Sequence, residues 1–223
     1  MKYLKKFDTE EDLQYVRANP NLILINNTKK VLYNVPVPNG VYIQHISGVL
    51  YTKEEWQSEG YDKGQANGVA VITDNAKFVV AKNSYENVVW SSNSTDLVEG
   101  ATVTTNNKIE DYNGKANTDA MLMTDVSGAA YTCVNYSFPN GSKGYLPALG
   151  ELRELYKNKA KAVSALNLID GGVLFPASFL WSSTQYSAVE SWGLKGYSDV
   201  EEGYRNQSKS TGYYVRPFTT LEL

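Results

Sequence analysis

The chain has 223 residues and a formal net charge of −3 at pH 7, with a sequence pI of about 5.3. This length can bury a full-sized core, and the absence of a basic field makes a nucleic-acid partner unexpected. No stretch approaches the roughly 18 to 20 apolar residues of a membrane span, and the first residues lack the apolar run of a signal peptide, so we expect synthesis in the cytoplasm without membrane insertion.

The single cysteine, Cys133, can form no internal disulfide, which excludes a disulfide-stapled secreted scaffold. Stability must therefore come from packing. The chain contains 17 tyrosines and 4 tryptophans, and they are concentrated where Gly, Ser and Asn are also frequent. This combination is typical of recognition surfaces, because aromatic rings give contact area at a low entropy cost and small polar residues give adaptable hydrogen bonds.

Residues 1–38 predict a small separate module for attachment or oligomerisation. Its helix is capped by Asp8, carries acidic residues in its first turn and ends at Asn19-Pro20. The expected elements in chain order are a helix over residues 8–18, a hairpin of residues 22–25 and 30–33, and a stiff extended linker over residues 35–40. We expect the main domain to span residues 39–223.

The main domain predicts an α+β fold, with strands, loops and one helical block. The expected elements are a hairpin of residues 40–46 and 48–51, a short helix over 52–56, a hairpin of 68–72 and 77–81, a segment over 83–113 that is mostly loop, a short helix starting near Ala116, and helices over 147–157 and 159–169. Residues 131–138 fit no single element. In the helix over 147–157, the leucines share one side and Glu151 and Glu154 are expected to point outward.

The last forty residues are the most informative part of the chain. A strand over 179–186 and a closing segment over 213–218 enclose a polar and aromatic run that has almost no apolar periodicity after Leu194. We expect this run to be exposed surface held between two packed strands. The side chains expected on that surface are Lys195, Tyr197, Asp199, Glu201, Glu202, Tyr204, Arg205, Lys209 and Tyr213.

Catalytic alternatives are weakly supported by the sequence. His45 is the only histidine, so a multi-histidine metal site is impossible, and its place in an apolar strand favours local hydrogen bonding. Cys133 lies in no nucleophile motif and is expected to be a small buried thiol. Ser182 and Ser183 have neither flanking glycines nor a nearby base, so they are expected in a buried strand.

A metal site is also not expected. The acids Asp199, Glu201 and Glu202 could ligate calcium, but their spacing does not match an EF-hand loop, and three acids on a solvated segment are usually a charged face. The turn over residues 141–144 does not open into a helix, so it is not a phosphate-binding loop. We expect no cofactor, no metal and no catalytic residue.

Four segments carry a resemblance to a known family. They are Gly144-Tyr-Leu-Pro-Ala-Leu-Gly-Glu-Leu-Arg-Glu-Leu-Tyr156, Leu180-Trp-Ser-Ser-Thr-Gln-Tyr186, Ser191-Trp192 and Tyr214-Val-Arg-Pro-Phe218. Together they resemble the C-type-lectin-like domain of variable proteins that retroelements diversify in phages and prophages of gut bacteria. The resemblance covers roughly residues 40 to 223 and is most specific in the last eighty. Residues 1–38 are similar to an attachment module of phage structural proteins.

The resemblance implies a C-type-lectin-like fold, shared with formylglycine-generating enzymes, whose variable region over about 181–218 presents exchangeable side chains on one ligand face. The ligand-binding positions that it implies are Val189, Glu190, Gly193, Lys195, Tyr197, Ser198, Asp199, Glu201, Gly203, Tyr204, Arg205, Asn206, Lys209, Thr211 and Tyr213. The scaffold positions that it implies are Trp181, Trp192, Leu194, Tyr214, Val215 and Arg216.

The chain also departs from related families. The calcium and sugar motifs of animal C-type lectins and the paired cysteines of formylglycine-generating enzymes are absent from the sequence. The resemblance therefore implies a non-enzymatic receptor-binding protein of a phage tail, carried in the virion, with a bacterial surface protein or glycan as ligand, tail or baseplate proteins as partners and a trimer as the favoured assembly. The alternatives are a bacterial cell-surface or pilus-associated adhesin with the same domain, and an enzyme of the formylglycine-generating fold.

Overall fold

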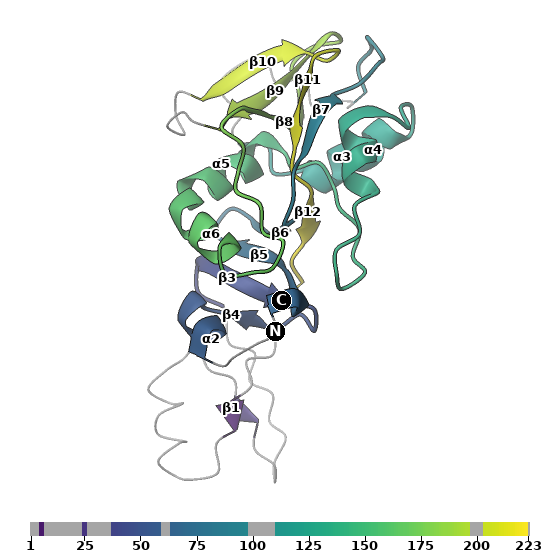
Figure 1. The fold of residues 1–223 in the computed structure, drawn as a ribbon. Helices are drawn as coiled ribbons and strands as arrows, with labels where there is room; N and C mark the ends of the chain where they lie inside the picture. Colours follow the sequence, from purple (N-terminus) through teal and green to yellow (C-terminus); the bar gives the residue numbers. More distant parts are fainter. Residues whose placement is uncertain are drawn as a thin grey trace.

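The computed structural model describes residues 5–6, 24–25, 37–58, 63–97, 110–196 and 203–222. These residues form two five-stranded sheets, placed one beyond the other along the molecule, and five α-helices (Figure 1). The two short strands near the N-terminus, β1 (Lys5–Lys6) and β2 (Leu24–Ile25), pair in parallel. The α+β class expected from the sequence is therefore confirmed.

The first large sheet, which we call the lower sheet, has the strand order β12-β6-β5-β3-β4. All of its pairings are antiparallel. Its strands are β3 (Gly40–His45), β4 (Leu50–Tyr51), β5 (Ala66–Ile72), β6 (Lys77–Val80) and β12 (Phe218–Thr220). All seven residues of the central strand β5 are buried, because both faces of the sheet are covered.

The second large sheet, the upper sheet, has the order β10-β9-β8-β11-β7. Its strands are β7 (Tyr85–Val89), β8 (Phe179–Gln185), β9 (Glu190–Lys195), β10 (Tyr204–Ser208) and β11 (Gly212–Val215). The pair β11–β8 is parallel, and the other pairs are antiparallel. Strand β8 lies inside the sheet and is buried throughout. Strand β10 lies at the edge of the sheet, where polar side chains are common.

The helices lie on two sides of these sheets (Figure 1). They are α2 (Lys53–Ser58), α3 (Gly114–Leu122), α4 (Gly128–Val134), α5 (Leu149–Lys157) and α6 (Lys159–Leu166), and the 3-10 turn η1 spans Lys63–Gln65. One side carries α5 and α6, and the other carries α3 and α4. None of the helices in the described part of the chain is long and apolar enough to cross a membrane.

A two-stranded ribbon joins the two sheets. β6 continues into β7 and β11 continues into β12, and the pairs β7–β11 and β6–β12 are both antiparallel. At the bend, the buried guanidinium of Arg216 donates hydrogen bonds to the carbonyls of Ala81, Lys82 and Val173, and to the hydroxyl of Ser84, over distances of 2.8 to 3.1 Å. Arg216 therefore fixes the direction in which the ribbon passes from one sheet to the other.

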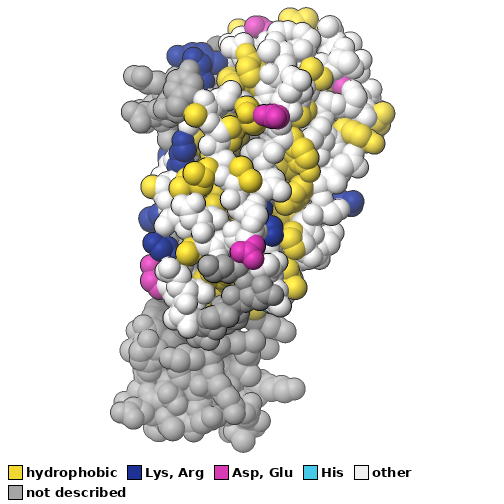
Figure 2. Space-filling view, in the orientation of Figure 1, with side chains coloured by type: hydrophobic (Ala, Val, Ile, Leu, Met, Phe, Trp, Pro, Cys, Tyr) yellow, Lys and Arg dark blue, Asp and Glu magenta, His cyan; other side chains and the backbone are white. Residues whose placement is uncertain are grey.

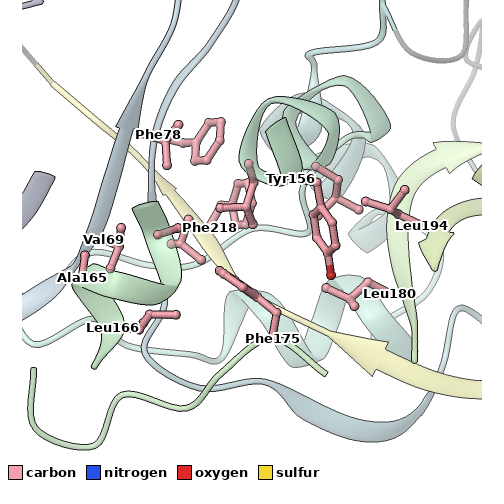
Figure 3. Packing of buried hydrophobic residues seen from close by; sticks show 14 of the residues in the cluster. Val69, Phe78, Tyr156, Ala165, Leu166, Phe175, Leu180, Leu194 and Phe218 are labelled. Atoms are coloured by element: carbon pink, nitrogen blue, oxygen red, sulfur yellow. The ribbon is translucent and has the colours of Figure 1, made fainter. Parts of the chain in front are cut away.

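The largest hydrophobic cluster is shared by both sheets and the helices α5 and α6. It brings Phe78 and Phe218 of the lower sheet together with Leu180 and Leu194 of the upper sheet (Figure 3). A second cluster around Trp90 and Trp181 packs under α3 and α4, and a third covers the other face of the lower sheet. On the face drawn in Figure 2, exposed hydrophobic side chains form a band along the molecule. Most of the Lys and Arg side chains on this face lie along the left edge of the molecule.

Most predicted elements of the main domain are confirmed. The hairpins β3–β4 and β5–β6 and the helices α3, α5 and α6 lie where the sequence predicts them. Thr52 caps α2, because its Oγ1 accepts from the N–H of Glu55 and its N–H donates to the Glu55 carboxylate. Of residues 131–138, which fitted no single element, only 131–134 belong to α4.

Three expectations are wrong or untested. Glu151 and Glu154 do not point outward but are 6% and 4% exposed. The segment over 83–113, expected to be mostly loop, contains the five-residue strand β7, which the sequence did not predict, and its residues 98–109 lie outside the described residues. In the N-terminal module, β2 pairs with β1 in parallel, while the expected helix over 8–18 and the hairpin partner over 30–33 lie outside the described residues.

Candidate functional site

The candidate ligand positions that the structure describes lie on β9, β10, β11 and the turns that join strands of the upper sheet. The register pairs Ser208 with Glu190, Asn206 with Trp192 and Arg205 with Gly193. The turn after β10 also lies beside the turn after β8, because the N–H of Lys209 donates to the carbonyl of Val189 at 3.0 Å. The structure thus brings two segments of the variable region together at one end of the molecule.

Seven candidates have exposed or half-exposed side chains. They are Val189, Glu190, Lys195, Arg205, Asn206, Thr211 and Tyr213, and we call them together the distal surface. They do not all lie on one face of the upper sheet, because Arg205 and Asn206 are consecutive residues of β10 and point to opposite faces. Val189 is 53% exposed, so its side chain is accessible from solvent. Tyr197, Ser198, Asp199, Glu201 and Glu202 lie outside the described residues.

Four candidates are not exposed, and the expectation that they form the surface is wrong. Gly193 and Gly203 are buried backbone positions. Tyr204 is 8% exposed and packs in the largest hydrophobic cluster with Trp192 and Leu194. The inward direction of Tyr204 follows from its register opposite Leu194, whose side chain lies in the same cluster.

Lys209 is the fourth buried candidate, at 2% exposure. Its ammonium group donates to the carbonyls of Thr95 and Ala188 and to the Gln185 side chain, over 2.8 to 3.1 Å, and lies 4.6 Å from the centre of the Trp90 ring. Burial lowers the pKa of Lys209 to about 8, and the carboxylate of Asp96 opposes that shift. Lys209 therefore ties three chain segments together beneath the distal surface.

The strands below the distal surface are held by hydrogen bonds of buried side chains. The indole N–H groups of Trp90 and Trp181 donate to the carbonyls of Ser182 and Val88, at 2.7 and 3.0 Å. The hydroxyls of Ser182 and Ser191 donate to carbonyls on the neighbouring strands, at 2.8 and 2.9 Å. These bonds confirm the expectation that Ser182 is a buried strand residue. They also hold β7, β8 and β9 together, and we call these three strands the frame.

Tyr213 links this frame to the edge strand. Its ring lies 4.7 Å from the Phe179 ring and 5.3 Å from the Trp181 ring, between ring centres. Its hydroxyl donates to the Gln207 side chain at 3.2 Å. Gln207 is half-exposed and was missed as a candidate, because only its contact with Tyr213 across the sheet reveals that it belongs to the same surface.

The side chains considered as catalytic alternatives, His45 and Cys133, both lie among the described residues. The ring nitrogens of His45 are hydrogen-bonded to Ser47 and Gln65, both at 2.7 Å. Cys133 is fully buried, and burial raises the pKa of its thiol, which keeps it protonated. No group of three or more His, Cys, Asp or Glu side chains that could hold a metal occurs in the ranges that the structure describes.

The described residues form a mixed α+β protein. Its fold is similar to that of a fimbrial protein from Bacteroides ovatus, with a TM-score of 0.51 and 14% sequence identity. The alignment covers 82% of this chain and 49% of the fimbrial protein, so the chain spans about half the length of that protein. No protein-family model and no curated protein matches the sequence.

Proposed function

We propose that this chain is a non-enzymatic ligand-binding domain of a bacterial surface adhesin of the fimbrial kind, and that the distal surface carries the binding residues. The similarity in fold to a fimbrial protein supports this class over the phage-tail protein that the sequence motifs favour. The observation that carries the proposal is the separation of frame and surface. Trp181, Trp192 and Leu194 are buried, whereas Val189 and Arg205 on the adjoining segments are exposed.

This separation suits recognition for a physical reason. Binding costs less conformational entropy when the backbone under the surface is already fixed, because fewer degrees of freedom are lost on contact. Exposed side chains on such a frame can differ without disturbing the core. We further propose that several copies, as in a trimer, act together, because linked copies gain strength through avidity.

A second candidate is a receptor-binding protein of a phage tail, with tail or baseplate proteins as partners. The motifs over residues 144–156 and 180–218 support it, because they resemble variable proteins diversified by retroelements. Immunodetection would separate the two candidates. Signal in sheared surface appendages supports the adhesin, and signal in purified virions supports the tail protein.

The binding proposal is tested with the labelled full chain and intact bacterial or host cells. We expect Arg205→Glu to reduce cell binding by at least about 10-fold, equivalent to about 1.4 kcal/mol. Lys161→Glu makes the same charge change at an exposed position of α6 and serves as the matched control. Equal binding of both variants, with both folded, would remove the distal surface from the proposal.

A further inference from the structure

Strand β10 is an uncovered edge of the upper sheet, whereas the other edges of the two large sheets are each protected. Helix α4 lies beside β7, and the N–H of Ala129 donates to the carbonyl of Trp90, which follows β7, at 3.1 Å. Strand β12 is bridged by Tyr145, which exchanges two hydrogen bonds with Phe218, at 2.7 and 3.0 Å. Strand β4 has only two residues. Shortness and cover are common ways in which proteins prevent a sheet edge from pairing with another chain.

Strand β10 is neither short nor covered within the described part of the chain. Its five residues pair with β9 in an unbroken register without a bulge, and they include no proline. It is the outermost strand of the upper sheet, and no described helix lies along its outer side (Figure 1). The strand is therefore regular enough to accept a further strand.

Two hydrogen bonds at the ends of β10 show which of its backbone groups face outward. The N–H of Lys195 donates to the carbonyl of Gly203 at 2.9 Å, and the N–H of Lys209 donates to the carbonyl of Val189 at 3.0 Å. In an antiparallel pair, the backbone groups of alternate residues face the partner strand. The odd-numbered residues of β10 therefore bond with β9, and the backbone groups of the even-numbered residues face away from it.

Asn206 is at the centre of this outward row. Its N–H and carbonyl form no backbone hydrogen bond among the described residues. The outward carbonyl of Tyr204 accepts from the guanidinium of Arg205 at 2.6 Å, and that of Ser208 accepts from the N–H of Thr211 at 3.0 Å. The N–H and carbonyl of Asn206 match the pair of groups that one residue of an antiparallel partner strand offers.

The charge on β10 indicates which segment fits this edge. Arg205 is the only charged residue of the strand, and its side chain is exposed. On an antiparallel partner strand, the residue opposite Arg205 is next to the one that bonds with Asn206, and opposite charges at such positions attract each other. A carboxylate there pairs with the guanidinium, which leaves the Tyr204 carbonyl to accept from the backbone of the incoming strand.

We propose that the ligand of the distal surface is a polypeptide, and that an extended segment of it adds to β10 as an antiparallel strand with an Asp or Glu opposite Arg205. This inference rests on the proposed function and names the kind of ligand that it requires. In strand addition, main-chain hydrogen bonds give affinity, and the side chains along the edge give specificity. Exchange of side chains on β10 then changes which segment binds and keeps the backbone bonds.

The test separates the backbone of Asn206 from its side chain. Asn206→Pro removes the outward N–H and keeps the bonds between β10 and β9, because proline is tolerated in an edge strand where the N–H faces solvent. Asn206→Ala removes the side-chain amide and keeps the N–H. We expect the labelled full chain with Asn206→Pro to bind intact bacterial or host cells at least about 10-fold more weakly than the chain with Asn206→Ala. Urea unfolding shows whether both variants are folded.

Ser208 provides a second pair of variants if Asn206→Pro does not fold. Its N–H also faces outward, so Ser208→Pro should bind more weakly than Ser208→Ala. The kind of ligand is tested on the same cells after treatment with proteinase K or sodium periodate. Binding of the wild-type chain should be lost after proteinase K and retained after periodate, which oxidises glycans.

The outcomes distinguish this inference from the proposed function. Equal binding by the folded proline and alanine variants overturns strand addition, and so does binding that survives proteinase K or is lost after periodate. If Arg205→Glu still reduces binding in that case, the distal surface remains the binding site and only strand addition is wrong. Unchanged binding by Arg205→Glu, or no binding of the wild-type chain to untreated cells, removes the proposed function and this inference with it.

Discussion

The guanidinium carbon of Arg216 lies 4.8 Å from the centre of the Phe175 ring, while its nitrogens bind the backbone of the ribbon that joins the two sheets. Arg216 is fully buried. Burial lowers its pKa to about 10, so the side chain remains charged at neutral pH. Among the described residues, this cation contacts backbone carbonyls, a hydroxyl and a ring but no carboxylate, so it depends on all of these partners together.

We expect Arg216→Met to lower the free energy of unfolding by at least about 3 kcal/mol, because the carbonyls of Ala81, Lys82 and Val173 lose their donor inside the protein. Urea unfolding measures the change. Arg205→Met removes an exposed guanidinium and should change stability by less than about 0.5 kcal/mol. Similar losses in both variants would contradict the role assigned to Arg216.

Arg216 also shows what the sequence can and cannot predict. The motif around it predicts a scaffold position, and it is one. The hairpins and α5 could be predicted because their apolar residues recur with the period of a strand or a helix. Strand β10 could not, because its polar residues pair with β9 through backbone groups, which leave no pattern in side-chain type.

The candidate surface could be predicted only in part for the same kind of reason. Charge predicted that Lys209, Glu151 and Glu154 would be exposed, and all three are buried. Each is buried beside hydrogen-bonding partners, several of them on segments distant in sequence, such as Thr95 for Lys209 and Asn75 for Glu154. Such partners come together only in the folded chain, so no local pattern could reveal them.

Two buried tyrosines offer a matched pair of hydroxyl deletions. The Tyr156 hydroxyl has no hydrogen-bond partner among the described residues and points toward Leu180 in the largest hydrophobic cluster (Figure 3). The Tyr145 hydroxyl donates to Glu151 at 2.7 Å. We expect Tyr156→Phe to leave stability unchanged or raise it by up to about 1 kcal/mol, and Tyr145→Phe to lower it by about 1 to 3 kcal/mol.

Thermal and urea unfolding of the two variants provide the comparison. Each substitution removes one oxygen atom and leaves the ring in place, so the transfer of apolar surface is nearly the same. A larger loss for Tyr156→Phe than for Tyr145→Phe would show that the Tyr156 hydroxyl has a partner that the described residues do not supply.

Gly193 lies inside the variable region but has no room for a larger side chain. A Cβ atom there would lie 2.2 Å from the Leu180 carbonyl oxygen and 2.4 Å from the Phe179 ring. We expect Gly193→Ala to lower the free energy of unfolding by about 2 kcal/mol or more, because a rigid strand must move to make room. Asn206→Ala on the neighbouring edge strand is the control and should change stability by less than about 0.5 kcal/mol. A stable Gly193→Ala variant would return this position to the candidate surface.

Glu151 predicts a pH dependence of stability whose direction can be worked out. Burial raises the pKa of its carboxyl from 4.5 to about 7, and the nearby Asp111 adds to the shift, while hydrogen bonds from the Ala148 N–H and the Tyr145 hydroxyl oppose it. The carboxyl is therefore protonated in the folded protein at pH values where it is ionised in the unfolded chain. Its contribution to stability is complete below pH 4.5 and is lost as the pH rises to about 7.

We expect the free energy of unfolding to fall by up to about 3 kcal/mol from this group across that window, since each unit of pKa difference corresponds to about 1.4 kcal/mol. Glu151→Gln cannot ionise, so the difference between variant and wild type should shrink or reverse in favour of the variant as the pH rises. Urea unfolding at half-unit steps from pH 4.5 to 7.5 measures this difference. Parallel curves for the two proteins would mean that the buried carboxyl is already ionised at the acidic end, with the hydrogen bonds from Ala148 and Tyr145 outweighing its burial.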